Sequence, residues 1–354
     1  MLAAMKKEIA LRKDYLRTPE LTEERIPTET LYIGGGTPSV LSCDELSDLL
    51  ATVRQYYRIV PDAEITLEAN PDDLTDEYLE GLRRLGFNRL SIGVQSFFDD
   101  DLQFMNRRHT GDEALRSIEA ARRCGFNNIN IDLIYGLPYG TQARWEENLA
   151  RAFAGGTPHI SAYHLTIESR TVFGRKQAKG EDFSIPEAES IRQFETLLDF
   201  AEKAGYEHYE ISNFAKPGFR SRHNSAYWQN RPYIGIGPAA HSYDGQSRQW
   251  NVNNNSRYID ILNCGKESWF EREDLSPADR YNDYVLTALR TVWGVDIEYV
   301  RYRFGAEFST EFSRQAVSYL QTGHLEKRGN TYVLTRKGKS VADRIASDLF
   351  RVSD

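Results

Sequence analysis

The chain has 354 residues, 40% of them hydrophobic and 27% charged, which is the composition of an ordinary globular protein with one large and one smaller domain. Its net charge of −8 argues against nucleic acid as the main partner, because binding phosphates requires a basic surface. No apolar run approaches the roughly 18 residues that a membrane span needs. Residues 1–15 carry lysines and arginines without the apolar core of a secretory signal.

The cysteines are few and widely spaced. There are three, Cys43, Cys124 and Cys264, and the nearest two are 81 residues apart in the sequence. This spacing excludes a disulfide framework and any metal or cluster loop formed within one segment. We expect buried or half-buried thiols in a reducing compartment, and therefore a cytoplasmic protein.

The first half of the chain alternates between strand-like and helix-like segments. Five short apolar or alternating runs that stop near turn residues predict strands over 30–36, 64–70, 89–96, 128–136 and 159–166. Segments with helical periodicity lie between them, over 42–57, 75–85, 111–124 and 141–153. This repetition is typical of a parallel sheet with right-handed crossovers, so we predict an α/β fold of the partial-barrel type over residues 1–205.

The pattern changes after residue 166. We expect a polar loop over 168–181, a helix over 186–204 and an aromatic, glycine-rich segment of short strands and ordered loops up to residue 275. Residues 276–354 then predict three helices, over 277–291, 297–302 and 310–322, followed by a β-hairpin over 324–335 and a last helix. This order resembles a winged-helix module. In an acidic chain we expect such a module to act as a lid or a protein contact.

Polar residues stand at the ends of the predicted strands, where parallel sheets bind ligands. Gly34, Gly35 and Gly36 close the first strand and let a ligand approach the backbone, although a tight turn alone also explains them. Glu68 with Asn70 ends the second strand, Gln95 with Ser96 ends the third, and Asp132 sits within the fourth. Carboxylates and an amide at several strand ends rarely serve as core filler. Arg107 adds a fork that suits a carboxylate, and a surface role is its alternative.

A second cluster, His223-Asn224-Ser225-Ala226-Tyr227-Trp228, places an imidazole close to two large aromatic residues. Such a set suits a flat, metal-bearing ligand, with the histidine on iron and the rings against a macrocycle. A hydrogen-bonded loop histidine followed by core aromatics is the alternative. Three nearby arginines could bind the propionates of such a macrocycle, namely Arg220, Arg222 and Arg231. His241 is the second candidate for the iron ligand.

Five runs carry a resemblance to a known family: GGGTP (34–38), EANP (68–71), IGVQSF (92–97), NRRH (106–109) and NIDLIYGLP (130–138). In this order they are similar to those of oxygen-independent coproporphyrinogen III oxidase and its relatives in the radical SAM superfamily. The resemblance implies a partial (β/α)6 TIM-like barrel that binds S-adenosylmethionine. It implies that the glycine turn, with Thr37, meets the methionyl amino group. By the same resemblance, the ribose and carboxylate are contacted by Glu68, Gln95, Arg107 and Asp132.

The run HNxxYW resembles the motif that distinguishes the heme-chaperone branch of this family. It implies heme binding by His223, Asn224, Tyr227 and Trp228, with His223 on the heme iron, and delivery of heme to acceptor proteins. Relatives begin with a strand and a CxxxCxxC loop that holds a [4Fe–4S] cluster, and this sequence contains no such motif. Either the start lies too far downstream or the motif has been lost. As given, we expect no reductive cleavage of S-adenosylmethionine.

Three functions therefore compete. The first is a heme chaperone, the second an oxygen-independent coproporphyrinogen III oxidase, and the third a cluster-less scaffold that binds other proteins. The HNxxYW run counts against the oxidase, so whether the chain is an enzyme stays open. A missing first strand would leave residues 30–36 at a sheet edge, which a homodimer could cover.

Overall fold

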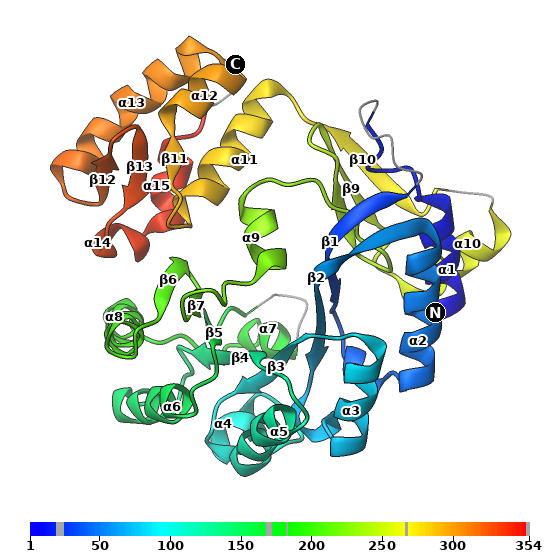
Figure 1. Cartoon of the computed structure of the whole chain (residues 1–354). Coiled ribbons are helices and arrows are strands. Elements are labelled where there is room, and N and C mark those ends of the chain that lie inside the picture. Colours follow the sequence, from blue (N-terminus) through cyan, green and yellow to red (C-terminus); the bar gives the residue numbers. More distant parts are fainter. Residues whose placement is uncertain (19–24, 168–171, 182, 266–267, 352–354) are drawn as a thin grey trace. The chain divides into compact units, whose positions relative to one another are not determined.

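The computed structural model describes residues 1–18, 25–167, 172–181, 183–265 and 268–351 (Figure 1). It divides into two compact units. The first unit comprises residues 1–31, 44–63 and 222–354, and the second comprises residues 32–43 and 64–221. Among the described helices, none combines the length and the apolar character that crossing a bilayer requires.

A seven-stranded sheet is the central element, with strand order β1-β2-β3-β4-β5-β7-β6. Its strands are β1 (Ile26–Ile33), β2 (Tyr57–Ala69), β3 (Arg89–Gln95), β4 (Asn128–Tyr135), β5 (His159–His164), β6 (Glu207–Glu210) and β7 (Asn213–Ala215). The run from β2 to β5 is parallel, as predicted. The antiparallel return through β7 and β6 was not predicted, because its strands are only three and four residues long.

Helices connect the parallel strands of the second unit. They are α3 (Asp76–Leu85), α4 (Asp99–Phe104), α5 (Gly111–Arg123), α6 (Gln142–Ala154), α7 (Val172–Gln177) and α8 (Glu187–Lys203). The threonine before α5 forms a capping box, because Thr110 and Glu113 satisfy each other's backbone N–H groups. Gly86 ends α3 in the left-handed conformation, with φ of 98°. Residues 172–177 form a helix where a loop was expected, and 168–171 of that predicted loop lie outside the described residues.

The two faces of this sheet differ in chemistry. Alternate residues such as Leu90, Ile92 and Ile131 are fully buried and form the apolar core. The residues between them are polar and also buried, among them Ser91 and Asn130. One face is thus apolar and the other is lined by hydrogen-bonding groups that lead up to the carboxyl ends of the strands.

In the first unit, helix α1 (Leu2–Leu11) is held by its buried Glu8. This carboxylate accepts hydrogen bonds from Gly237 N at 2.8 Å, Asn251 Nδ2 at 2.7 Å and Trp269 Nε1 at 3.0 Å. The unit also contains an antiparallel sheet of order β10-β9-β8. Its remaining elements before the C-terminal module are α2 (Cys43–Tyr56), α9 (Arg222–Trp228), β8 (His241–Tyr243), β9 (Ser247–Asn251), α10 (Asn255–Cys264) and β10 (Phe270–Asp274).

The C-terminal module has the winged-helix order that the sequence predicted. Its elements are α11 (Pro277–Leu289), β11 (Val295–Asp296), α12 (Ile297–Phe304), α13 (Ala306–Gln321), β12 (Leu325–Arg328), β13 (Thr331–Leu334), α14 (Arg336–Lys339) and α15 (Ala342–Asp348). The strands form a sheet of order β11-β13-β12. Val285, Phe312 and Ile345 are fully buried and fill the space between its helices.

Candidate functional site

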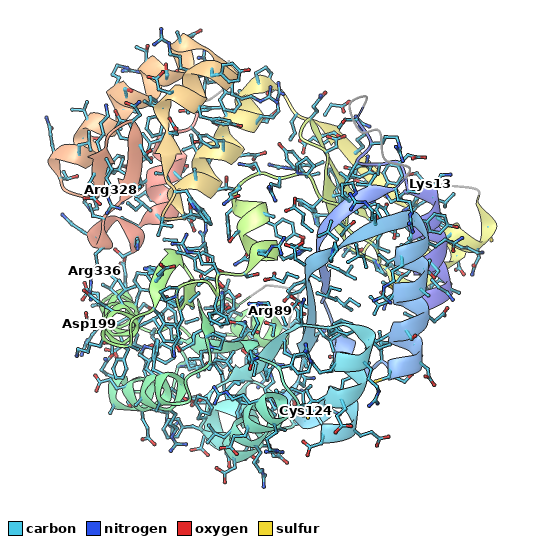
Figure 2. The ribbon with its side chains drawn as sticks, viewed as in Figure 1. Lys13, Arg89, Cys124, Asp199, Arg328 and Arg336 are labelled. Atoms are coloured by element: carbon cyan, nitrogen blue, oxygen red, sulfur yellow. The ribbon has the colours of Figure 1, made fainter. Side chains whose placement is uncertain are left out.

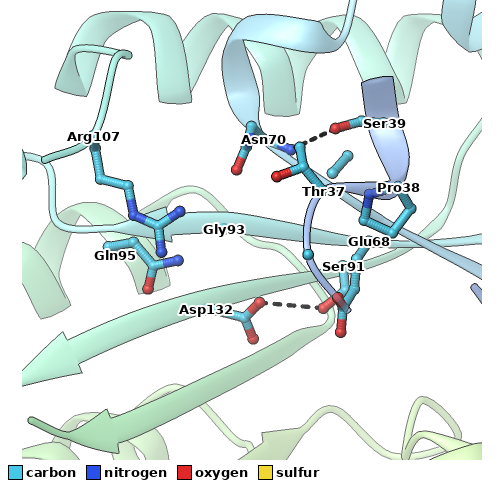
Figure 3. Close-up of a pocket in the computed structure, with 12 residues that line it drawn as sticks. Thr37, Pro38, Ser39, Glu68, Asn70, Ser91, Gly93, Gln95, Arg107 and Asp132 are labelled. Carbon is cyan, nitrogen blue, oxygen red and sulfur yellow. Dashed lines mark hydrogen bonds between the residues drawn. The ribbon is translucent and has the colours of Figure 1, made fainter. Parts of the chain in front are cut away.

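Most of the predicted strand-end residues line one pocket of the second unit, whereas Gly34, Gly35 and Ser96 are not part of its lining (Figure 3). Gly36 and Thr37 follow β1, Glu68 is the last residue but one of β2, and Asp132 lies within β4. The full lining is Gly36, Thr37, Pro38, Ser39, Glu68, Ala69, Asn70, Ser91, Gly93, Gln95, Arg107 and Asp132. Parallel strands bring these residues together because their carboxyl ends meet at one edge of the sheet.

The glycine turn is bound to Glu68. Gly35 and Gly36 have φ of 81° and 65°, a left-handed conformation that side chains disfavour. The Gly35 N–H donates to Glu68 Oε2 at 2.8 Å, and the Tyr32 hydroxyl donates to Glu68 Oε1 at 2.6 Å. Gly34 allows this close approach, because a Cβ there would lie 2.4 Å from the Tyr32 ring. The turn is therefore a rigid part of the pocket wall.

The end of β3 is irregular where it meets the pocket. Gln95 has φ of 65°, a left-handed conformation that is uncommon for residues other than glycine, and the β3–β4 register shifts between Ile92 and Gln95. Gly93 lies inside this stretch, and a Cβ there would lie 2.8 Å from the side-chain Nε2 of Gln95. Backbone strain of this kind is often found at ligand sites.

Opposite charges face the pocket. Asp132 Oδ1 accepts from Asn130 Nδ2 at 2.8 Å and its Oδ2 accepts from Ser91 Oγ at 3.3 Å. Burial raises the pKa of Asp132 to about 6, and the hydrogen bond from Asn130 opposes this rise. Burial lowers the pKa of Arg107, and the charge of Asp132 opposes that shift. Figure 3 shows the Arg107 guanidinium extending toward Gln95.

These groups fit a ligand that carries both charges. The Arg107 fork suits a carboxylate, whereas Glu68 and Asp132 accept hydrogen bonds from hydroxyl or ammonium groups. Two acidic side chains against one guanidinium favour a ligand with net positive charge. The donor and acceptor set therefore fits S-adenosylmethionine, which carries an ammonium, a sulfonium, a carboxylate and two ribose hydroxyls.

Sequence reasoning did not single out all of the lining. The lining residues to which sequence reasoning gave no role are Pro38, Ser39, Ala69, Ser91 and Gly93. A glycine inside a strand pattern often marks a bulge or a close backbone approach, so Gly93 carried a usable signal. The Ser39 hydroxyl accepts from Asn70 N at 3.2 Å, a contact between distant segments that no local pattern indicates.

The second cluster lies in the first unit, on a helix rather than on the loop that was expected. Helix α9 carries His223 and Tyr227 four residues apart, so their rings share a face, with centroids 4.9 Å apart and planes at 89°. His223 Nδ1 lies 2.9 Å from the hydroxyl oxygen of Thr30. Tyr227 is 38% exposed and packs edge-on against Tyr233 at 4.4 Å. Asn224 is half-buried on the same helix.

Trp228 points to a different neighbour. The guanidinium of Arg290 lies 5.2 Å from the centre of its ring. The indole N–H of Trp228 is buried and has no hydrogen-bond partner among the described residues. Adjacent residues on a helix do not share a face, so Trp228 is separated from the side of α9 that carries His223 and Tyr227. Trp228 thus packs against Arg290, the residue that follows α11.

The expected arginines already have partners. Arg222 pairs with Asp62 at 3.4 Å and Arg231 with Glu29 at 2.7 Å, both within the first unit. These pairs are exposed and are worth at most about 1 kcal/mol each, so a ligand carboxylate can replace either partner at small cost.

The remaining arginine and the reserve histidine lie elsewhere. Arg220, in the second unit, pairs with Glu207 at 2.9 Å. The reserve ligand His241 is exposed at the start of β8, and its ring centroid lies 6.4 Å from that of Trp250.

The three cysteines are distributed over both units. Cys43 and Cys124 are half-buried in the second unit and Cys264 is exposed in the first. Figure 2 shows Cys124 at the helical side of its unit, away from Arg89 in the sheet. Within the described ranges, no three histidine, cysteine or acidic side chains are placed to hold a metal ion.

Comparison with known proteins identifies the family. Residues 12–152 match the model of the radical SAM superfamily, and residues 275–341 match the HemN C-terminal domain. The chain is 33% identical over 318 residues to the heme chaperone HemW of Bacillus subtilis. This alignment covers 90% of this chain and 84% of that protein. It is 32% identical over 349 residues to the heme chaperone HemW of Mycobacterium tuberculosis, covering 98% of this chain and 85% of the relative.

A solved structure supports the fold. Coproporphyrinogen III oxidase (HemN) from Escherichia coli, a radical SAM enzyme, superimposes with a TM-score of 0.83 at 23% identity, covering 99% of this chain and 82% of that one. The likeness confirms the predicted radical SAM fold, with its partial barrel followed by a C-terminal module. Together with the two chaperones, it shows that the chain belongs to the HemW family of the radical SAM superfamily.

Proposed function

We propose that this chain is a heme-binding chaperone that hands heme to acceptor proteins, and that His223 is the ligand to the heme iron. The observation that carries the proposal is the hydrogen bond between His223 Nδ1 and Thr30. Metal-ligating histidines typically have one ring nitrogen fixed by such a bond, which sets the orientation of the ring and its tautomer.

The neighbourhood of His223 supports this role. The edge of Tyr227 meets the His223 ring at 89°, and its partial exposure leaves aromatic surface for a macrocycle. Burial raises the pKa of Tyr227 to about 12, so its phenol stays neutral at physiological pH. Both residues come from α9, so a bound macrocycle would rest on a single rigid element.

S-adenosylmethionine is the proposed ligand of the other pocket. When bound there it would supply the sulfonium chemistry of the superfamily. The residues of this chain would hold its carboxylate with Arg107 and its hydroxyl and ammonium groups with Glu68 and Asp132. A [4Fe–4S] cluster is a further cofactor of the superfamily, and we propose that Cys43, Cys124 and Cys264 do not ligate one.

The setting of this activity is also proposed. The three cysteines are far apart in the sequence, which is typical of proteins in a reducing compartment, and we infer the cytoplasm. Strand β1 is at the edge of the seven-stranded sheet, so we propose that this edge can pair with a second copy of the chain. Sedimentation at several protein concentrations tests the dimer, and a single monomeric species throughout would exclude it.

A transfer assay tests the chaperone function. The heme-loaded chain is mixed with apomyoglobin as a spectroscopically distinct acceptor, and we expect one heme per chain to move to the acceptor. A matched assay for decarboxylation of coproporphyrinogen III tests the oxidase alternative. The proposal fails if the chain binds no heme at stoichiometric concentrations, or if it decarboxylates the porphyrinogen.

A further inference from the structure

Tyr32 and Gly35 both form hydrogen bonds to Glu68, a residue that lines the proposed S-adenosylmethionine pocket. No sequence pattern marked Tyr32 as functional. It lies near the end of β1, and its hydroxyl donates to Glu68 Oε1 at 2.6 Å. The other carboxylate oxygen, Oε2, accepts from the Gly35 N–H at 2.8 Å. Each oxygen of Glu68 is therefore held by a different donor, one on β1 and one on the glycine turn.

The packing shows that this contact is built into the turn. A Cβ at Gly34 would lie 2.4 Å from Tyr32 Cε1 and 2.9 Å from Glu68 Cδ. Side-chain atoms essentially never approach so closely, so only glycine at position 34 lets the phenol reach the carboxylate. The requirement for Gly34 thus follows from the Tyr32–Glu68 contact, independently of any ligand.

The protonation state of Tyr32 suits a permanent donor. Burial and the neighbouring charge of Glu68 raise the pKa of Tyr32 far above its ordinary value of 10. The phenol therefore keeps its proton throughout the physiological range. A carboxylate has about four lone-pair positions, so with two of them occupied Glu68 still has acceptor capacity for a ligand in a fixed direction.

We propose that Tyr32 is a positioning residue for the ligand of this pocket. Its hydrogen bond fixes the rotation of the Glu68 carboxylate and ties the glycine turn to β2. Glu68 is therefore already oriented toward the hydroxyl or ammonium groups of a nucleoside sulfonium, and binding does not incur the entropy cost of ordering it. This role rests on the proposed binding of S-adenosylmethionine. Tyr32 acts through Glu68 and touches no reacting atom.

A double-mutant cycle tests the proposal by calorimetric titration of the 354-residue chain with S-adenosylhomocysteine and with S-adenosylmethionine. Tyr32→Phe removes one hydroxyl and should weaken binding about 3- to 10-fold, which is the usual range for one hydrogen bond. In a Glu68→Ala background the same change should alter the dissociation constant by less than about twofold, since the carboxylate it orients is gone. Tyr78→Phe is the matched control, because the Tyr78 phenol donates to Leu41 O at 3.0 Å in the same unit and should leave binding unchanged.

Three results would overturn the inference. The first is that Tyr32→Phe binds both ligands as tightly as the wild type does. The second is that Tyr32→Phe weakens binding by the same factor whether or not Glu68 is present, which would mark a purely structural role. The third is that the wild type binds neither nucleoside, in which case the proposed pocket ligand falls as well. Hydrogen exchange gives a readout that needs no ligand. The Gly35 amide should exchange faster in Tyr32→Phe and not in Tyr78→Phe, and equal exchange would contradict the tie to β2.

Discussion

The imidazole Nδ1 of His223 lies 2.9 Å from the hydroxyl oxygen of Thr30, so a residue of β1 sets the orientation of the ring on α9. Both residues belong to the first unit, where Thr30 and His223 are 193 positions apart in the sequence. A contact over such a separation is formed only in the folded protein. Heme affinity should therefore depend on Thr30 although threonine is no ligand to iron.

Thr30→Val tests this dependence. Valine has nearly the same shape and favours strands, so β1 should keep its conformation. Loss of the hydroxyl should weaken heme binding by about 10- to 100-fold, which is typical when the partner of a ligating histidine is removed. Thr28→Val on the same strand is the control. Equal heme affinities for the two variants, measured by titration at the Soret band, would show that Thr30 does not orient the ligand.

Asp132 makes stability depend on pH. Its pKa is about 6 in the folded protein against an ordinary 3.8, so the folded state binds more protons than the unfolded state between these values. The free energy of unfolding should therefore fall as the pH rises through this window, and the loss should persist above it. Asp132→Asn should be more stable than the wild type by about 1–2 kcal/mol at pH ~7.5 and should show no such gain at pH ~4.

Urea unfolding at the two pH values measures this difference. Glu119→Gln, which changes an exposed carboxylate on α5, is the control and should be close to neutral at both. An Asp132→Asn variant whose stability relative to the wild type does not change with pH would show that the carboxyl is not buried in the folded state.

Glu8 should be a large contributor to the stability of the first unit. Its carboxylate accepts from Gly237 N, Asn251 Nδ2 and Trp269 Nε1, and all of these groups are donors. Glu8→Gln brings a further donor into this buried cluster and should lower the free energy of unfolding by about 3–5 kcal/mol. Asp48→Asn, which breaks only the exposed pair with Lys6, should cost less than about 1 kcal/mol. Urea unfolding that gives similar losses for both variants would contradict the buried network.

Trp228 should stabilise the fold without contacting heme. Its ring lies under Arg290 on the α11 side of α9, so Trp228→Phe should lower stability by about 1–3 kcal/mol and leave the Soret maximum unchanged. Tyr227→Ala should do the opposite, weakening heme affinity with little change in the free energy of unfolding. A shifted Soret maximum in Trp228→Phe would show that Trp228 contacts the heme.

Parallel topology explains why much of the pocket was predictable. Glu68 and Gln95 were found because a strand end can be read from the sequence, and parallel strands place their ends at one edge. Asp132 was found as a carboxylate inside a strand that is otherwise largely apolar. Tyr32 and Ser39 were not found, because their roles arise from contacts with Glu68 on β2 and with Asn70 just after it. No local periodicity encodes such pairs.

Short elements were the least predictable part of the fold. Helix α9 has only seven residues, and its Asn224 and Ser225 favour turns in isolation. Packing of α9 against α11 provides what local preference does not, as the Arg290–Trp228 contact shows. Strand β2 was expected to begin at residue 64 and begins at Tyr57, so it includes Pro61, a residue that argues against a strand in the sequence.

The spectrum of the heme complex of His223→Ala tests the central claim most directly. The wild type and the variant are titrated with hemin under identical conditions, with His241→Ala as the control. We expect His223→Ala to shift the Soret maximum and to weaken binding at least about tenfold, because the axial nitrogen is lost, while His241→Ala keeps the wild-type spectrum. An unchanged Soret band and affinity in His223→Ala, or a shifted band in His241→Ala alone, would contradict the assignment of His223 as the iron ligand.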